Sequence, residues 1–255
     1  HLNPRDLLRG HIRDLASNLP GVCFMELALR LGNPKVDHLG EALTGDKNIT
    51  IGYQSGNNTQ DGLRNTLVGY GAGFNVTSGD NNLILGYTAG QAGSPGGAIS
   101  TANNTIVLGD ENIANAHIQV DWTVASDKRD KTDVEPVKMG LDFVNKLEPV
   151  TYHWDKRARY VSDEDRKDGS VDLNDVVHDG THKEDWTDIG FLAQDVETLE
   201  EAAGHKISDK TNLTTNLTDD GKQYSLIYAK FVPILTKAIQ ELSAENDALE
   251  TSNTA

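Results

Sequence analysis

The sequence predicts a mixed fold, in which a glycine-rich β-structured segment precedes an α+β domain that ends in a long helix. A repeat of short apolar triplets, each closed by glycine, occupies residues 45–110. The chain becomes strongly charged after residue 125. Residues from about 229 to 250 have the apolar spacing of an amphipathic helix. We therefore predict two domains, residues 1–125 and 126–255.

The repeat is marked by Gly-Tyr pairs at residues 52–53, 69–70 and 86–87, which are 17 residues apart. A fourth copy at 104–110 follows after 23 residues, and the Gly/Pro-rich loop at 93–97 absorbs most of the extra length. Each unit reads as a short strand closed by glycine turns. A strand this short cannot bury its apolar face alone, so we expect the units to stack or to pair across subunits.

The three tyrosines of these pairs form a ladder at 17-residue intervals. A carbohydrate-binding platform is one interpretation of such a ladder, and a structural stack inside a trimer is the one we favour. Residues 1–40 are less informative, because 5–19 look amphipathic and 24–31 suit either a helix or a strand. The start at His1 rather than Met suggests a fragment or a processed piece.

In the second half, the pattern alternates between short apolar elements and polar arms. The expected elements, in order, are a helix at 135–146, a strand at 150–154, a charged protruding loop at 155–188, a strand and helix at 187–199, a polar arm at 208–222 and a last helix at about 229–250. Leu235, Leu242 and Leu249 lie seven residues apart in the last helix. This stripe predicts association between subunits, although a helix lying on its own domain would show a similar one.

Composition excludes several classes of function. The net charge is −16, with 7 basic and 11 acidic residues before position 126 and 16 and 28 after it, so we expect no nucleic-acid partner. No apolar run of about 18 residues exists, so we expect no membrane insertion. The single cysteine, Cys23, excludes an internal disulfide framework. Hydrophobic residues make up 37% of the chain, which suits an elongated assembly that buries its core between subunits.

We expect neither a cofactor nor a metal. His153, His178 and His182 invite a zinc interpretation, but Gly180 and the surrounding charge indicate a loop rather than a helix. An EF-hand register set by Gly169 would require Arg166 as a ligand, and arginine cannot bind calcium. No pair of acids is placed persuasively for glycoside hydrolysis.

Ser126 and Lys131 lie five residues apart where the composition changes. A serine hydroxyl is a poor nucleophile until a base takes its proton, and a lysine can be that base only when burial lowers its pKa. Ser-Lys pairs are a known variant of nucleophilic catalysis. The spacing alone is more typical of a solvated turn, so its meaning depends on the rest of the chain.

Four motifs in order give that context: Ser-Asp-x-Arg-x-Lys with Thr-Asp-Val at 126–134, Leu-Asp-Phe-Val to His-Trp at 141–154, Gly-Phe-Leu-Ala-Gln-Asp-Val-Glu at 190–197, and Tyr-Ser-Leu-Ile-Tyr at 224–228. Together they resemble the endosialidase-type intramolecular chaperone, a self-cleaving peptidase family at the C-terminus of phage tailspikes and tail fibres. A related domain occurs in membrane-tethered transcription factors of animals. Upstream, the repeats resemble the β-roll heads of trimeric adhesins.

The resemblance implies a single-turnover serine peptidase in which Ser126 is the nucleophile and Lys131 the general base. It places the cut between Ser126 and Asp127, with Arg129, Gly190 and Gln194 in the supporting motif. The chemistry leaves alternatives, because a serine that attacks its own carbonyl would form a strained four-membered lactone. Attack on the preceding carbonyl would split the bond before Ser126, and attack across subunits could cut after it.

The resemblance further implies the C-terminal part of a phage tail fibre, a homotrimer made in the host cytoplasm and located in the virion tail. Residues 1–125 would be a fibre segment near the tip, whose partner is a carbohydrate or outer-membrane component of the bacterial surface. Residues 126–255 would align the three chains and then release themselves. The alternative is a membrane-tethered or surface protein that uses the same cleavage to release an upstream domain.

Overall fold

The computed structural model describes residues 27–29, 45, 47–168 and 171–254. The predictions for residues 5–19, for Cys23 and for most of 24–31 lie outside the described residues. The described chain forms two compact units: residues up to Gln91 together with Ser100–Gly109, and Ala92–Ile99 together with Asp110–Ala255.

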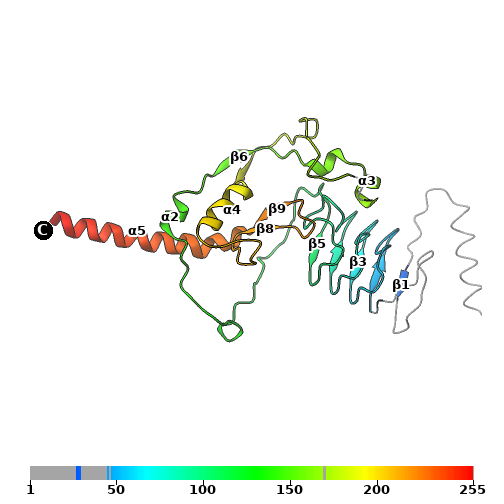
Figure 1. The fold of residues 1–255 in the computed structure, drawn as a ribbon, viewed down its shortest axis with the longest axis horizontal. Helices are drawn as coiled ribbons and strands as arrows, with labels where there is room; N and C mark the ends of the chain where they lie inside the picture. Colours follow the sequence, from blue (N-terminus) through cyan, green and yellow to red (C-terminus); the bar gives the residue numbers. More distant parts are fainter. Residues whose placement is uncertain (1–26, 30–44, 46, 169–170, 255) are drawn as a thin grey trace, which may run out of the picture. The chain divides into compact units, whose positions relative to one another are not determined.

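The first unit is a five-stranded sheet in which each predicted repeat supplies one short strand (Figure 1). Its strands are β1 (Leu27–Leu29), β2 (Ile49–Ile51), β3 (Thr66–Val68), β4 (Leu83–Leu85) and β5 (Ile106–Leu108). β2 to β5 are parallel and follow one another in chain order, whereas β1 pairs with β2 in the antiparallel direction. The chain therefore winds as a coil, with one strand in each turn.

Side chains alternate across these strands, so the middle residue of each triplet points into the coil. Thr50, Leu67, Ile84 and Val107 occupy these middle positions and are buried. The flanking positions face outward, and Ile106 is 66% exposed there. An outer face rich in apolar residues is unusual for a parallel sheet, because such sheets are normally covered on both faces.

The tyrosine ladder forms within one chain. The ring centroids of Tyr53 and Tyr70 are 5.4 Å apart and those of Tyr70 and Tyr87 are 5.2 Å apart, in stacked geometry. All three rings remain partly exposed, with Tyr53 at 56% and Tyr87 at 50%. The stacking within one chain is compatible with either interpretation, and burial of the ladder inside a trimer stays a prediction.

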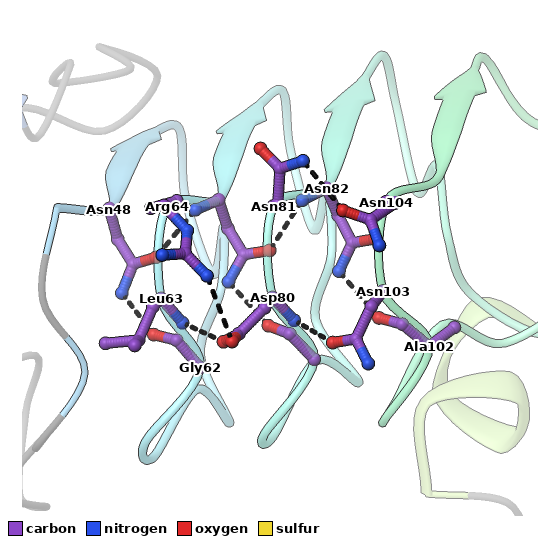
Figure 2. A network of polar contacts seen from close by, with 12 residues as sticks. Asn48, Gly62, Leu63, Arg64, Asp80, Asn81, Asn82, Ala102, Asn103 and Asn104 are labelled. Atoms are coloured by element: carbon purple, nitrogen blue, oxygen red, sulfur yellow. Dashed lines mark hydrogen bonds and ion pairs between the residues drawn. The ribbon is translucent and has the colours of Figure 1, made fainter. Parts of the chain in front are cut away.

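Buried asparagines connect successive turns of the coil (Figure 2). The Asn48 Oδ1 atom accepts a hydrogen bond from the Asn65 backbone N–H at 2.8 Å, and Asn65 Oδ1 accepts one from Asn82 N–H at 3.0 Å. The Asn65 side-chain amide also donates to the Gly79 carbonyl at 2.8 Å. These asparagines thus give buried backbone groups of the turns the hydrogen-bond partners that burial requires.

Replacing Asn65 by alanine is expected to destabilise the first unit by about 3 kcal/mol. The change leaves the Gly79 carbonyl and the Asn82 N–H without their buried partners, and each such group costs about 1–3 kcal/mol. Urea denaturation followed by circular dichroism measures the loss. Asn57→Ala, at an exposed position of the same coil, is the control. Equal midpoints for the two variants would contradict this role of Asn65.

The second unit combines two small sheets with helices. Its elements are η1 (Lys128–Asp130), α2 (Leu141–Val144), β6 (Val150–Tyr152), η2 (Arg157–Tyr160), α3 (Asp163–Asp168), β7 (Asp188–Gly190), α4 (Ala193–Ala202), β8 (Thr215–Leu217), β9 (Tyr224–Leu226), η3 (Tyr228–Lys230) and α5 (Phe231–Thr254). The antiparallel pairs are β6 with β7 and β8 with β9. The main core of this unit consists of Met139, Phe143, Val196, Phe231 and Ile234.

Two sequence expectations for this unit were wrong. The helix expected at 135–146 is the four-residue α2, because Pro136 disfavours helical backbone at Glu135 and Gly140 interrupts the segment with a non-helical conformation. The loop expected to protrude at 155–188 instead contains a buried cluster, in which Leu173 is 1% exposed. Ala158 and Val161 of the same segment pack with Leu173, and Ala92 completes the cluster from a distant part of the chain, which the local composition did not reveal.

The compact units also divide differently from the boundary expected after residue 125. Residues 92–99, which lie inside the repeats, and residues from Asp110 onward belong to the second unit. The extra length of the last repeat is therefore part of the second unit's structure. Residues 118–137 follow with little regular structure other than the short η1 helix.

Candidate active site

A tight turn brings Ser126 and Lys131 together. Asp127 precedes the three-residue 3₁₀ helix η1 and caps it, because its carboxylate accepts the backbone N–H of Arg129 at 2.9 Å. The Arg129 guanidinium folds back onto the same carboxylate, with Nη2 at 2.6 Å from Oδ2. The hydrogen bonds from Arg129 lower the pKa of Asp127, and Asp127 in turn raises the pKa of Arg129. The pair therefore stays charged and holds the turn closed.

The Lys131 Nζ atom lies 2.7 Å from Ser126 Oγ, within hydrogen-bond distance. This is the contact that a lysine base needs to remove a serine proton. Both residues are exposed to solvent in the single chain. The single chain therefore gives the amine none of the burial that a lysine base requires.

The structure places the supporting residues elsewhere. Gly190 ends β7, where a Cβ atom would overlap the Tyr228 hydroxyl oxygen, so glycine is required for packing. That hydroxyl accepts the backbone N–H of Phe191 at 3.1 Å. Gln194 lies in the first turn of α4, and its carbonyl accepts a hydrogen bond from Thr198. Among the described residues, no hydrogen bond or ion pair joins Gly190 or Gln194 to the turn at 126–131.

A feature that the sequence reasoning missed lies directly upstream of the turn. Ile118, Val120, Trp122 and Val124 alternate with polar residues, and all four are more than half exposed. Strict alternation of this kind is the signal of a half-buried strand. Trp122 and Val124 lie four and two residues before Ser126. The segment thus offers apolar side chains beside the dyad that find no cover within the described chain.

The three histidines considered for zinc do not converge. His153 Nδ1 contacts the Glu184 carbonyl at 3.0 Å, His182 packs edge-on against Tyr160, and His178 is exposed. In the described parts of the chain, no three His, Cys, Asp or Glu side chains gather in a metal-binding arrangement. Across the same residues, no helix has both the length and the apolar character needed to cross a bilayer.

Comparison with known proteins agrees with the motifs. No curated protein sequence matches the chain closely enough to count as a relative. Residues 126–205 match the model of the family described as chaperone of endosialidase. The matched segment begins at Ser126, includes Lys131 and extends past α4. Family members are self-cleaving chaperone domains, so the match supports an intramolecular chaperone role and is consistent with autoproteolysis. Residues 126–205 are thus a region similar to the chaperone of endosialidase family.

Proposed function

We propose that this chain is the C-terminal part of a phage tail fibre, whose second half aligns three copies and then cuts itself from the upstream segment beside Ser126. The observation that supports this most strongly is the 2.7 Å contact between Lys131 Nζ and Ser126 Oγ, at the first residue of the family match. The activity is a single-turnover serine peptidase reaction within the assembly.

The reaction is an acyl transfer. Neutral Lys131 takes the Ser126 hydroxyl proton while Oγ attacks a peptide carbonyl carbon, and the C–N bond breaks as the leaving amine receives that proton. The product is an ester on Ser126, which water hydrolyses to a free carboxylate and the restored hydroxyl. By family resemblance the broken bond follows Ser126. Attack by the hydroxyl of a neighbouring copy would avoid the four-membered ring that attack on its own carbonyl requires.

Assembly of three copies would supply the apolar cover that the Ser126–Lys131 dyad lacks in a single chain. Because both dyad residues are exposed, the amine needs an apolar cover before it loses its proton. The exposed Trp122 and Val124 are close in sequence to the dyad, and three copies brought together would bury them beside it. Cleavage would then report correct trimer formation, because it would begin only when the dyad is buried between copies and not when a single chain has been synthesised.

The first unit supports the fibre interpretation. Its coil leaves an outer row of apolar side chains uncovered, including Ile49, Ile106 and Leu108, which suits burial between subunits. Three such coils must pair along their lengths although their local sequence hardly fixes the register between chains, which makes correct pairing slow. A temporary trimeric clamp would help, because it raises the effective concentration of the three chains. We propose that the upstream segment belongs to a virion tail fibre that contacts a carbohydrate or an outer-membrane component of the host surface.

The test uses three variants that differ at single positions of the turn. We expect the wild-type chain to yield two fragments on a denaturing gel, and Ser126→Ala and Lys131→Ala to stay full-length. Lys128→Ala is the matched control, because Lys128 is an exposed lysine of the same turn. Cleavage of Ser126→Ala, or equal loss in Lys128→Ala and Lys131→Ala, would contradict the dyad.

A further inference from the structure

In the second unit, residues from upstream of Ser126 make noncovalent contacts with residues from downstream of it. Residues 92–99 and 110–111 come from upstream of Ser126, and residues 156–168, residues 171–176 and Asp220 come from downstream. We call their shared contact the retention surface. It consists of an ion pair, a small apolar cluster and two close glycine contacts.

The ion pair is between Glu111 and Arg166. Their closest atoms, Oε1 and Nη1, are 2.5 Å apart, and the side chains are only 4% and 6% exposed. Arg166 also pairs with Asp163 on its own helix, and Lys156 Nζ donates to the Glu111 carbonyl at 2.9 Å. Burial alone would lower the pKa of Arg166, but these carboxylates raise it above its ordinary value. Separation of the two sides would return both charges to water, so the pair adds specificity more than net affinity. Removal of one partner alone would instead leave the other charge buried without its counter-charge, and this is costly.

A small apolar cluster also joins the two sides. Ala92, from the upstream side, packs with Ala158, Val161 and Leu173 from the downstream side. Ala98 joins the edge of the cluster, and its backbone N–H donates to Asp220 Oδ2 at 2.9 Å. Both kinds of contact therefore connect residues that belong to different products after the cut.

Two glycines allow the loop at 92–99 to pack closely against the downstream residues. A Cβ atom on Gly93 would overlap the Ala158 Cβ, and one on Gly97 would lie 2.8 Å from the Asp220 carboxylate. Both glycines have positive φ angles, +93° and +73°. A larger residue at either position would clash or strain, so the upstream loop is shaped to fit this downstream surface.

We propose that the retention surface keeps the downstream fragment bound to the upstream fragment after cleavage, so that cutting and departure are separate events. The partner that this surface fits is the 92–99 loop of the same chain. This inference rests on the proposed self-cleavage for its biological meaning, but the surface itself does not depend on the dyad. Both fragments are net acidic, so their mutual repulsion acts against retention.

The test compares cut chains under native and denaturing conditions. Wild-type protein should show two fragments on a denaturing gel and one complex by native mass spectrometry. Glu111→Gln removes one charge of the buried pair, and Gly93→Ala introduces the clash with Ala158. Each variant should weaken the complex by about 100-fold or more, which dilution series will reveal as free fragments.

Gly180→Ala is the matched control. Gly180 has a φ of +89°, close to that of Gly93, but a Cβ atom at this position would meet nothing within 4 Å, so the substitution introduces similar backbone strain without a clash. It should behave as the wild type. Wild-type fragments that separate as soon as they are cut would overturn the inference. Complexes of Glu111→Gln and Gly93→Ala as tight as that of Gly180→Ala would overturn it as well.

A second version of the experiment tests the retention surface without relying on self-cleavage. In a Ser126→Ala chain, a recognition sequence for a site-specific protease replaces the exposed residues 113–117, and added protease makes the cut. Retention in this arm, with loss in Glu111→Gln, supports the surface even when the wild-type chain never cuts itself. Immediate separation here refutes the surface even when self-cleavage is real.

Discussion

A chain with Leu235→Asp and Leu242→Asp in α5 is expected to stay monomeric and uncut, whereas we expect the wild-type chain to assemble and cut itself. These leucines are 43% and 46% exposed, on a helix of 24 residues whose buried positions are Phe231, Ile234 and Ala238. They are therefore free to contact other copies without contributing to the core. Aspartates at a seam between three helices would bring like charges together.

The expected fall in cleavage rate is about 100- to 1000-fold. Without assembly Lys131, Trp122 and Val124 stay exposed, so the dyad lacks the apolar cover that general-base catalysis by a lysine needs. Sedimentation and a timed denaturing gel measure assembly and cleavage in the same sample. Gln240→Asp with Ser243→Asp adds the same charge at exposed positions off the seam and should assemble and cut normally. A monomeric double-leucine variant that is cut at the wild-type rate would separate cleavage from assembly.

Glu200→Gln is expected to lower the stability of the second unit by about 2–4 kcal/mol at neutral pH. The side chain is fully buried in α4 and accepts hydrogen bonds from the backbone and hydroxyl groups of Thr214 and Thr215. The Thr214 bonds are 2.6 Å and 2.5 Å long. These contacts fasten the β8–β9 hairpin to α4. The amide in Glu200→Gln has only one oxygen to accept these hydrogen bonds, and its NH₂ group would face the N–H and O–H donors of Thr214 or Thr215.

The loss of stability in Glu200→Gln should become smaller as the pH falls. Burial by itself would raise the pKa of Glu200, but the four hydrogen bonds outweigh it, so the pKa lies below its ordinary value. A carboxylate with a lowered pKa stabilises the fold above its unfolded pKa, about 4.3, and that contribution disappears as the pH falls through the folded value. The difference between wild type and Glu200→Gln should therefore shrink in acid.

Urea denaturation at several pH values tests this. Glu201→Gln, one residue further along α4 and exposed, removes the same charge without these contacts. It should leave the midpoint nearly unchanged at every pH. A Glu200→Gln chain as stable as Glu201→Gln at neutral pH would show that the carboxylate does not hold the hairpin.

The repeats were predictable from the sequence because each strand is specified locally. The strands β2, β3 and β4 each stand directly between an Asn and a Gly, so the 17-residue interval fixes their register without knowledge of distant contacts. The asparagines that directly precede β2, β3 and β4 bond to the neighbouring turns, so their physical role also follows from the repeat. The strand and helix at 188–202 were predictable for the same reason, since their apolar spacing is local.

The parts that were not predictable depend on distant partners. Leu173 lies in a charged stretch and is buried with Ala158 of the same stretch and with Ala92, which lies 81 positions earlier in the chain. The dyad was predictable as a spacing and a resemblance, but not as a contact. The distance between Lys131 and Ser126 depends on the turn that the Asp127–Arg129 pair holds.

The central claim is that Ser126 directs a cut in its own chain once copies assemble. Intact-mass spectrometry of the purified, assembled wild-type chain tests it most directly. The proposal predicts that the 27.7 kDa chain is replaced by two products, with a junction at a peptide bond of Ser126 and, by the family resemblance, a downstream product that begins at Asp127. An assembled chain that keeps its full mass, or a junction away from Ser126, would contradict it.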